Sequence, residues 1–153
     1  MKLSRDLASS PIAPIRIVHI GLGAFHRAHQ AWYTSRADIE RQWGIAAFTG
    51  RSPEAAIKLN SQDNLYTLIE RGPEKDTFEV ITSISATYDI DDYWQLKELI
   101  ANPLVAIVSL TITEAGYNFK PTGGLNREDS QVDEDIENLN VDDYVPYLSL
   151  IHI

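Results

Sequence analysis

The segment from Ile15 to Gln30 constrains the fold of this chain more than any other stretch. It opens with an apolar run in which β-branched residues predominate, as is typical of a strand buried on both faces, and we expect that strand at 16–20. Gly21 and Gly23 follow at once, and after them comes a polar and aromatic stretch with helical character. A strand, a glycine turn and a helix in this order open many α/β sheets, so the segment predicts that class of fold.

Apolar runs and helical patterns alternate up to residue 110, and beyond it the acidic stretch 126–143 predicts either a weak helix or a surface loop. We expect helices at 25–40, 53–60 and 92–100, and strands at 16–20, 43–49, 65–69, 78–84 and 104–110. The strands at 65–69 and 78–84 flank a turn-forming segment and predict a hairpin, whereas 104–110 predicts a central strand. The expected fold is α/β, with a Rossmann-like, mostly parallel sheet that carries an inserted β-hairpin and is incomplete at the C-terminus.

Composition narrows the classes of partner. The 153 residues suffice for one domain of ordinary size, and a formal net charge of −9 argues against binding to nucleic acid. The chain has no cysteine, which excludes disulfides and thiolate metal sites and fits a reducing compartment. It also has neither a signal-peptide pattern nor an apolar run of the roughly 18 residues that a membrane span needs. We therefore expect a cytoplasmic protein that binds neither nucleic acid nor membrane.

The glycine turn departs from the dinucleotide-binding pattern Gly-x-Gly-x-x-Gly, because His26 occupies the position of the third glycine. The pattern alone leaves a nucleotide-binding turn and a plain tight turn equally open. If a dinucleotide binds, Arg27 and the backbone amides of Leu22 to Phe25 would hold its pyrophosphate. The candidate cofactor-binding residues of the turn are Gly21, Leu22, Gly23, Ala24, Phe25 and Arg27. We interpret His26 and His29 as structural and expect no metal site, since no carboxylate lies nearby in the sequence.

Two segments, Val18–Gln30 and Val108–Tyr117, resemble the long-chain mannitol dehydrogenase family, which includes mannitol 2-dehydrogenases, D-arabinitol dehydrogenases and fructuronate reductases. The shorter segments 50–52 and 62–67 are also similar to that family, in which the form Gly-x-Gly-x-Phe-His-Arg is the expected one. The resemblance implies a dinucleotide-binding N-terminal domain joined to a helical catalytic domain. It further implies reversible hydride transfer between a nicotinamide cofactor and a polyol or sugar acid, of the mannitol/fructose or mannonate/fructuronate type.

The resemblance also predicts how the chain is divided. We expect a loose lead-in at 1–14, a partial dinucleotide-binding domain at 15–147 and a non-native tail at 148–153. The family's general base is a lysine in a Lys-x-x-x-x-Asn-x-x-His motif of the C-terminal helical domain, and this chain has no such motif. Because oxidation of an alcohol must also remove a proton, we expect that domain and all catalytic residues to be absent, and the chain alone to be inactive.

Further candidates follow two of the strands. NAD sites usually place a carboxylate after the second strand, but Arg51 stands there, where it would accept the 2′-phosphate of NADP, stack on adenine or lie in solvent. The resemblance favours NAD and leaves NADP open. Thr111 and Thr113 are candidate cofactor contacts and Glu114 a substrate-proximal residue, unless all three only bond within a strand-to-loop turn.

The sequence is also compatible with two other functions. The first is a nucleotide-binding module without catalysis, with which the absence of the lysine motif agrees. The second is part of a dinucleotide-binding enzyme of another class. The matches around Phe25 and Thr111 argue against the second alternative. The leading hypothesis is the cofactor-binding part of an oxidoreductase.

Overall fold

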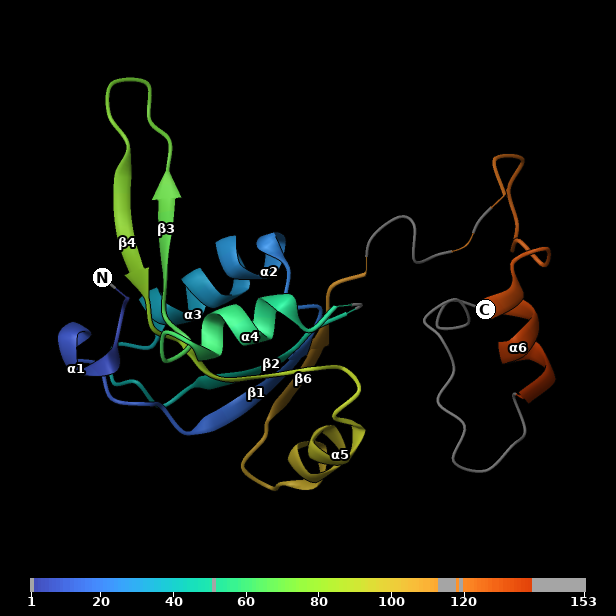
Figure 1. Ribbon diagram of the computed structural model, residues 1–153, viewed down its shortest axis with the longest axis horizontal. Coiled ribbons are helices and arrows are strands. Elements are labelled where there is room, and N and C mark those ends of the chain that lie inside the picture. Colours follow the sequence, from blue (N-terminus) through green and yellow to red (C-terminus); the bar gives the residue numbers. More distant parts are fainter. Residues whose placement is uncertain (1, 51, 113–117, 119, 139–153) are drawn as a thin grey trace. The chain divides into compact units, whose positions relative to one another are not determined.

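The computed structural model describes residues 2–50, 52–112, 118 and 120–138 (Figure 1). It divides into two compact units, 1–111 and 112–153, and each is described by itself. The first unit contains every strand with stated bounds and the candidate cofactor-binding turn. The predicted tail at 148–153 lies outside the described residues.

A parallel four-stranded sheet forms the centre of the first unit, in the order β5-β2-β1-β6. Its strands are β1 (Ile15–Ile20), β2 (Gly44–Phe48), β5 (Ile84–Tyr88) and β6 (Ile107–Leu110). In the register of β1, Ile20 lies beside Phe48 of β2 on one side and beside Leu110 of β6 on the other. The carboxyl ends of these strands therefore meet at one edge of the sheet, where ligands bind in open α/β folds.

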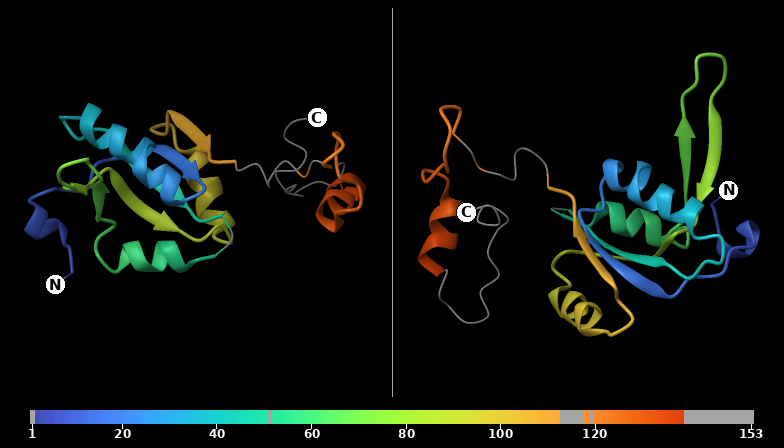
Figure 2. Two further views of the ribbon diagram at one scale, coloured as in Figure 1. Left: turned by 90° about the horizontal axis from the view of Figure 1, so that it is seen from above. Right: turned by 180° about the vertical axis from the view of Figure 1, so that it is seen from behind.

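Helices cover both faces of this sheet (Figures 1 and 2). Helices α2 (Ala24–Ala28) and α3 (Gln30–Ala37) follow β1, α4 (Glu54–Asn60) follows β2, and α5 (Tyr93–Ala101) precedes β6. Alternate residues of β2 point to opposite faces: Ile45 packs with residues of α3 and α4, and Ala46 packs with residues of α5. A parallel sheet with helices packed on both faces confirms the predicted α/β class.

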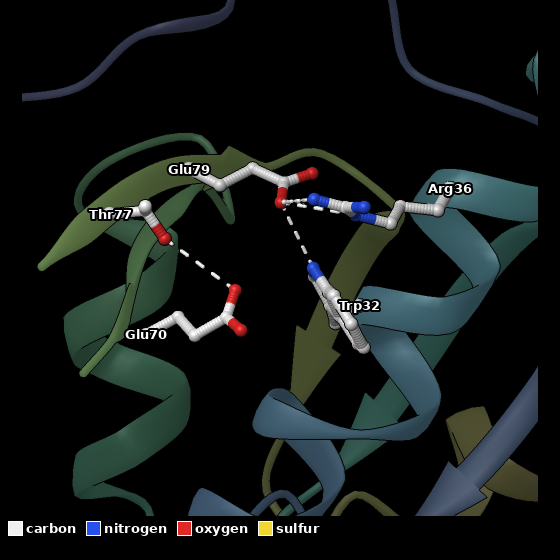
Figure 3. A network of polar contacts seen from close by, with 5 residues as sticks. All are labelled: Trp32, Arg36, Glu70, Thr77 and Glu79. Carbon is white, nitrogen blue, oxygen red and sulfur yellow. Dashed lines mark hydrogen bonds and ion pairs between the residues drawn. The ribbon is translucent and has the colours of Figure 1, made fainter. Parts of the chain in front are cut away.

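The predicted hairpin is present as a separate antiparallel pair, β3 (Tyr66–Glu70) and β4 (Thr77–Ile81). Figure 3 shows how a side-chain network ties it to α3. Glu79 of β4 accepts a hydrogen bond from Trp32 Nε1 at 3.0 Å and forms an ion pair with Arg36 at 2.9 Å. The Arg36 guanidinium also lies 4.8 Å from the centre of the Trp32 ring, so three side chains fix the base of the hairpin against the helix.

Two predicted elements are divided in the structure. The single helix expected at 25–40 is broken at His29, whose φ of −120° and ψ of −84° are not helical. The Phe25 side chain in its first part is 64% exposed. The single strand expected at 78–84 ends at Ile81, and Ile84 then begins β5 of the parallel sheet. The Ser83 carbonyl between them already accepts from the Ile45 amide at 2.9 Å, a long-range contact that sequence periodicity does not reveal.

The strand predicted at 104–110 as central is β6, which pairs in parallel with β1. Among the described residues β6 is an edge strand, and the side chains of Ile107, Val108 and Leu110 are exposed. Hydrophobic content indicates that a strand suits burial, but it does not tell which neighbours the strand has. In α5, likewise, Leu96 is buried whereas the larger apolar side chain of Trp94 is exposed.

The lead-in predicted at 1–14 contains a short helix that the sequence did not indicate: residues Arg5–Ala8 form α1, and Arg5 is only 9% exposed. The Arg5 guanidinium donates hydrogen bonds to four backbone carbonyls, which lie in the lead-in, in the α4–β3 loop, between β4 and β5 and at the start of β5. Their oxygens belong to Asp63, Pro11, Thr82 and Ile84, at 3.1, 3.3, 3.0 and 2.6 Å. One side chain therefore fastens the lead-in to the sheet.

In the second unit, residues Ser130–Asn138 form helix α6. The acidic stretch 126–143, left open between a helix and a loop, is thus helical over that part. Lys120 and Glu128 form an ion pair at 2.8 Å in the same unit. Among the described residues, no helix combines the length and apolar character that crossing a membrane requires.

We expect replacement of Arg5 by methionine to lower the free energy of unfolding by about 3 kcal/mol, since four carbonyls lose their donor. Urea denaturation measures the effect. Arg71→Met is the matched control, because Arg71 is 82% exposed at its side chain and forms only a 3.8 Å ion pair. A loss no larger than that of the control would contradict the anchoring role of Arg5.

Candidate functional site

The turn between β1 and α2 is held to the end of β2 by its own backbone. The Gly21 and Leu22 amides both donate to the Phe48 carbonyl, at 3.0 and 2.8 Å, and the Gly23 amide donates to the Gly21 carbonyl at 2.6 Å. The Leu22 side chain is buried in the core that faces α3 and α4. The turn is therefore a rigid part of the sheet edge.

Gly21 and Gly23 serve different needs. Gly21 has a φ of +111°, and a Cβ atom there would lie 3.1 Å from Thr111 Cβ and 3.2 Å from the Thr111 carbonyl oxygen. The fold itself thus requires glycine at this position. At Gly23, φ is −108° and an added Cβ would meet only the Gly21 carbonyl oxygen, at the ordinary contact distance of 3.7 Å. Nothing in the described chain requires glycine there, which leaves room for a ligand to approach the backbone.

Arg27 belongs to α2, and its side chain lies against the turn. Its Nε donates to the Gly23 carbonyl at 3.2 Å, so the guanidinium is held beside the turn. The Leu22 amide is bonded to β2 and the Gly23 amide to the turn, so neither has the role toward a pyrophosphate that the sequence predicted. The amides of Ala24 and Phe25 begin α2 and have no partner within the described residues. These two amides and Arg27 are the groups that the turn offers to an anion.

Two histidines are stacked beneath the turn. The rings of His19 in β1 and His26 in α2 are nearly parallel, with 3.7 Å between centroids and 9° between planes. The side chains are 2% and 1% exposed. His19 Nδ1 is bonded to the Ser109 hydroxyl at 2.9 Å, and Nε2 lies 3.1 Å from the Thr111 hydroxyl. His26 Nδ1 is bonded to Gln30 Oε1 at 3.0 Å, so His26 fills the space that a third glycine would leave empty.

Burial decides the charge of this pair. The pKa of His26 is lowered to about 3. Desolvation is the largest cause, the neighbouring His19 and Arg27 also lower the pKa, and the Gln30 hydrogen bond raises it. Desolvation also lowers the pKa of His19, partly offset by its hydrogen bond to the Gly21 carbonyl. Both rings are therefore neutral near pH 7. Burial raises the pKa of Tyr66, whose hydroxyl donates to the Arg27 carbonyl at 2.6 Å.

The structure brings most of the predicted site residues to the same edge of the sheet. Gly21, Leu22, Gly23, Ala24, Phe25, Arg27 and Thr111 all lie at the carboxyl ends of β1 and β6 or at the start of α2. Arg51, Thr113 and Glu114 fall outside the described residues, so their predicted roles remain predictions. Sequence reasoning did not identify Gln30 and Ser109 at the site. The signal for Ser109 was a single polar residue within an apolar run, and Gln30 lies in a stretch that is polar throughout.

This combination of a parallel sheet, a glycine turn and a short helix at its carboxyl edge defines a Rossmann domain of the dehydrogenase class. Residues 15–145 match the family described as the mannitol dehydrogenase Rossmann domain. The chain belongs to the mannitol dehydrogenase family. A dehydrogenase domain of this kind implies a nicotinamide dinucleotide cofactor.

Individual relatives agree with this assignment. The chain is 37% identical over 131 residues to the D-mannonate oxidoreductase of Escherichia coli K12, covering 80% of the chain and 27% of the relative. It is 39% identical over 133 residues to the mannitol 2-dehydrogenase of Aspergillus clavatus, covering 81% of the chain and 26% of the relative. The chain thus spans about a quarter of the length of these proteins.

A solved structure shows the same fold. The crystal structure of a D-sorbitol dehydrogenase in substrate-free form aligns with a TM-score of 0.72 and 32% sequence identity. The alignment covers 90% of this chain and 32% of that one.

Burial of His26 makes the stability of the chain depend on pH. The ordinary pKa of histidine is 6.5 and that of folded His26 is about 3, so between these values the unfolded chain binds the extra proton and stability falls as pH falls. From pH 7.5 to pH 5, this group alone lowers the free energy of unfolding by about 2 kcal/mol. Urea titrations at both pH values measure the loss, which we expect to be smaller by that amount in His26→Gln. Equal losses in the two proteins would show that His26 is not kept neutral.

Proposed function

We propose that the chain is the cofactor-binding part of an oxidoreductase that transfers a hydride between NAD and a polyol or sugar acid. The substrates would be of the mannitol/fructose or mannonate/fructuronate type, in keeping with the relatives that are named for mannitol and mannonate. The observation that carries the proposal is the contrast at the turn: Gly21 is required by the fold, whereas Gly23 leaves an open approach to the backbone. An approach of this kind suits the pyrophosphate of a dinucleotide.

The residues at the turn suit that ligand. The Ala24 and Phe25 amides would donate to pyrophosphate oxygens, and the Arg27 guanidinium, held at the Gly23 carbonyl, would neutralise their charge. Thr111, at the end of the neighbouring strand, would lie toward the nicotinamide half. When bound, the cofactor supplies the hydride acceptor, and the chain's own groups orient it.

The proton that leaves the alcohol needs a base, and we place that base outside this chain. Relatives that the chain matches over about a quarter of their length have ample sequence for a second domain. Among the described residues at the edge of the site, His19 and His26 are buried in mutual contact and are not open to a substrate. The chain alone is accordingly proposed to bind the cofactor without turning over a substrate.

A carboxylate near the end of β2 supports the choice of NAD over NADP. Asp89 directly follows β5, and its Oδ1 accepts a hydrogen bond at 3.2 Å from the hydroxyl of Thr49, the residue after β2. A carboxylate at this edge accepts hydrogen bonds from ribose hydroxyls and repels a 2′-phosphate. It would stand in for the acidic residue that the sequence lacks after the second strand.

The two glycines provide a test of the site. We expect Gly23→Ala to unfold within about 0.5 kcal/mol of the wild type, since its backbone angles are open to alanine, yet to bind NADH at least about tenfold more weakly. Gly21→Ala should instead lose about 2 kcal/mol of stability, because φ is positive and Thr111 is close. Urea denaturation and NADH titration followed by saturation-transfer NMR measure the two effects, with the exposed Thr67→Ala as control. Wild-type affinity in Gly23→Ala, or no binding by the unaltered chain, would overturn the proposal.

Cofactor preference forms a separate prediction. We expect NADH to bind at least about tenfold more tightly than NADPH, and Asp89→Asn to reduce this ratio to about threefold by removing the repelling charge. The same NMR titration with both cofactors measures the ratio. A preference for NADPH in the unaltered chain would overturn the assignment of NAD and point to Arg51 instead.

A further inference from the structure

The stacked histidines connect the two halves of the sheet edge. Gln30 of α3 accepts from His26 and donates through Nε2 to the Ser109 hydroxyl of β6 at 3.0 Å. Ser109 is also bonded to His19, and His19 in turn approaches the Thr111 hydroxyl and the Gly21 carbonyl, at 3.1 and 3.3 Å. The chain of contacts therefore runs from α2 through α3 and β6 back to the turn. We name these five side chains, His19, His26, Gln30, Ser109 and Thr111, the histidine network.

The network contacts the two residues at which the turn and the end of β6 come closest, Gly21 and Thr111. Gly21 faces Thr111 so closely that a single added Cβ would lie 3.1 Å from the threonine side chain. The Thr111 amide is fixed by the Ile20 carbonyl at 2.9 Å, and its hydroxyl is fixed by His19. The separation between the turn and the end of β6 thus depends on side chains that lie beneath both.

Packing alone does not account for these polar groups. Apolar side chains of similar volume would fill a buried space at least as stably, because the polar groups must first be desolvated. His26 Nε2 is buried and, within the described residues, has no hydrogen-bond partner, which adds a cost. What hydrogen bonds provide beyond packing is direction, since each fixes the orientation of the groups that it joins.

We propose that the histidine network positions the glycine turn and the end of β6 for a dinucleotide, with His26, Gln30 and Ser109 as positioning residues that do not touch the ligand. His26 thereby replaces the third glycine of the usual turn by a different device, a stacked and hydrogen-bonded spacer. This inference rests on the proposed function for the identity of the ligand. The positional effect on the turn is independent of that identity.

Amide hydrogen exchange of the unaltered 153-residue chain and of Ser109→Ala provides the test. The Gly21 and Leu22 amides, which donate to Phe48, report on the turn. We expect both to exchange at least about fivefold faster in Ser109→Ala, and NADH to bind at least about fivefold more weakly. Ser109→Thr retains the hydroxyl and should restore most of both properties.

A destabilised control separates positioning from general weakening of the fold. Ile81→Val removes one methylene from the core at a residue of β4 that is not a member of the network, and it should lower stability by about 1 kcal/mol. It should leave the protection of the turn, relative to the other sheet amides, unchanged. Equal acceleration at the turn in Ile81→Val and Ser109→Ala would overturn the proposal, as would unchanged exchange in Ser109→Ala. If the unaltered chain binds no NADH, the proposed function fails, whereas the exchange measurement still decides on the network.

Discussion

The pairing of β1 with a parallel strand on each side is the constraint on which the site depends. Because β2 and β6 end beside it, the chain that leaves β1 must turn within the space between their carboxyl ends. The Phe48 carbonyl of β2 takes two amides of the turn, and Thr111 after β6 leaves room for no side chain at Gly21. This placement fixes where the turn, α2 and the guanidinium of Arg27 lie.

The turn from β1 into α2 lacks the third glycine of the usual dinucleotide-binding turn. A glycine there lets helix and strand pack closely. Here the ring of His26 lies between helix and strand and stacks on the ring of His19. Both rings must be neutral in this position, because burial penalises their charged forms. Helix α2 is short and ends before His29, so the close packing that glycine serves is limited to a single turn of helix.

The features of the fold that depend on residues near one another in the sequence could be predicted, and those that depend on distant partners could not. The buried strands β1 and β2, the hairpin and the helix after Pro53 are each marked by periodicity or turn residues within a few positions. The division of 78–84 into two strands, the pairing of β6 with β1 and the burial of Arg5 depend on partners distant in the sequence. Arg5, for example, bonds to carbonyls of Thr82 and Ile84. No local pattern records such a partner.

The same limit applies to the site. The sequence by itself determined the strand, the glycine turn, the helix start and the family, because these are set by residues adjacent along the chain. Only the tertiary structure decided that Gly21 is required by Thr111 while Gly23 is left open, and that His26 is a spacer stacked on His19. The physical reason is that contact, burial and pKa are properties of neighbours in space, and the sheet brings Thr111 beside a turn about ninety residues earlier in the chain.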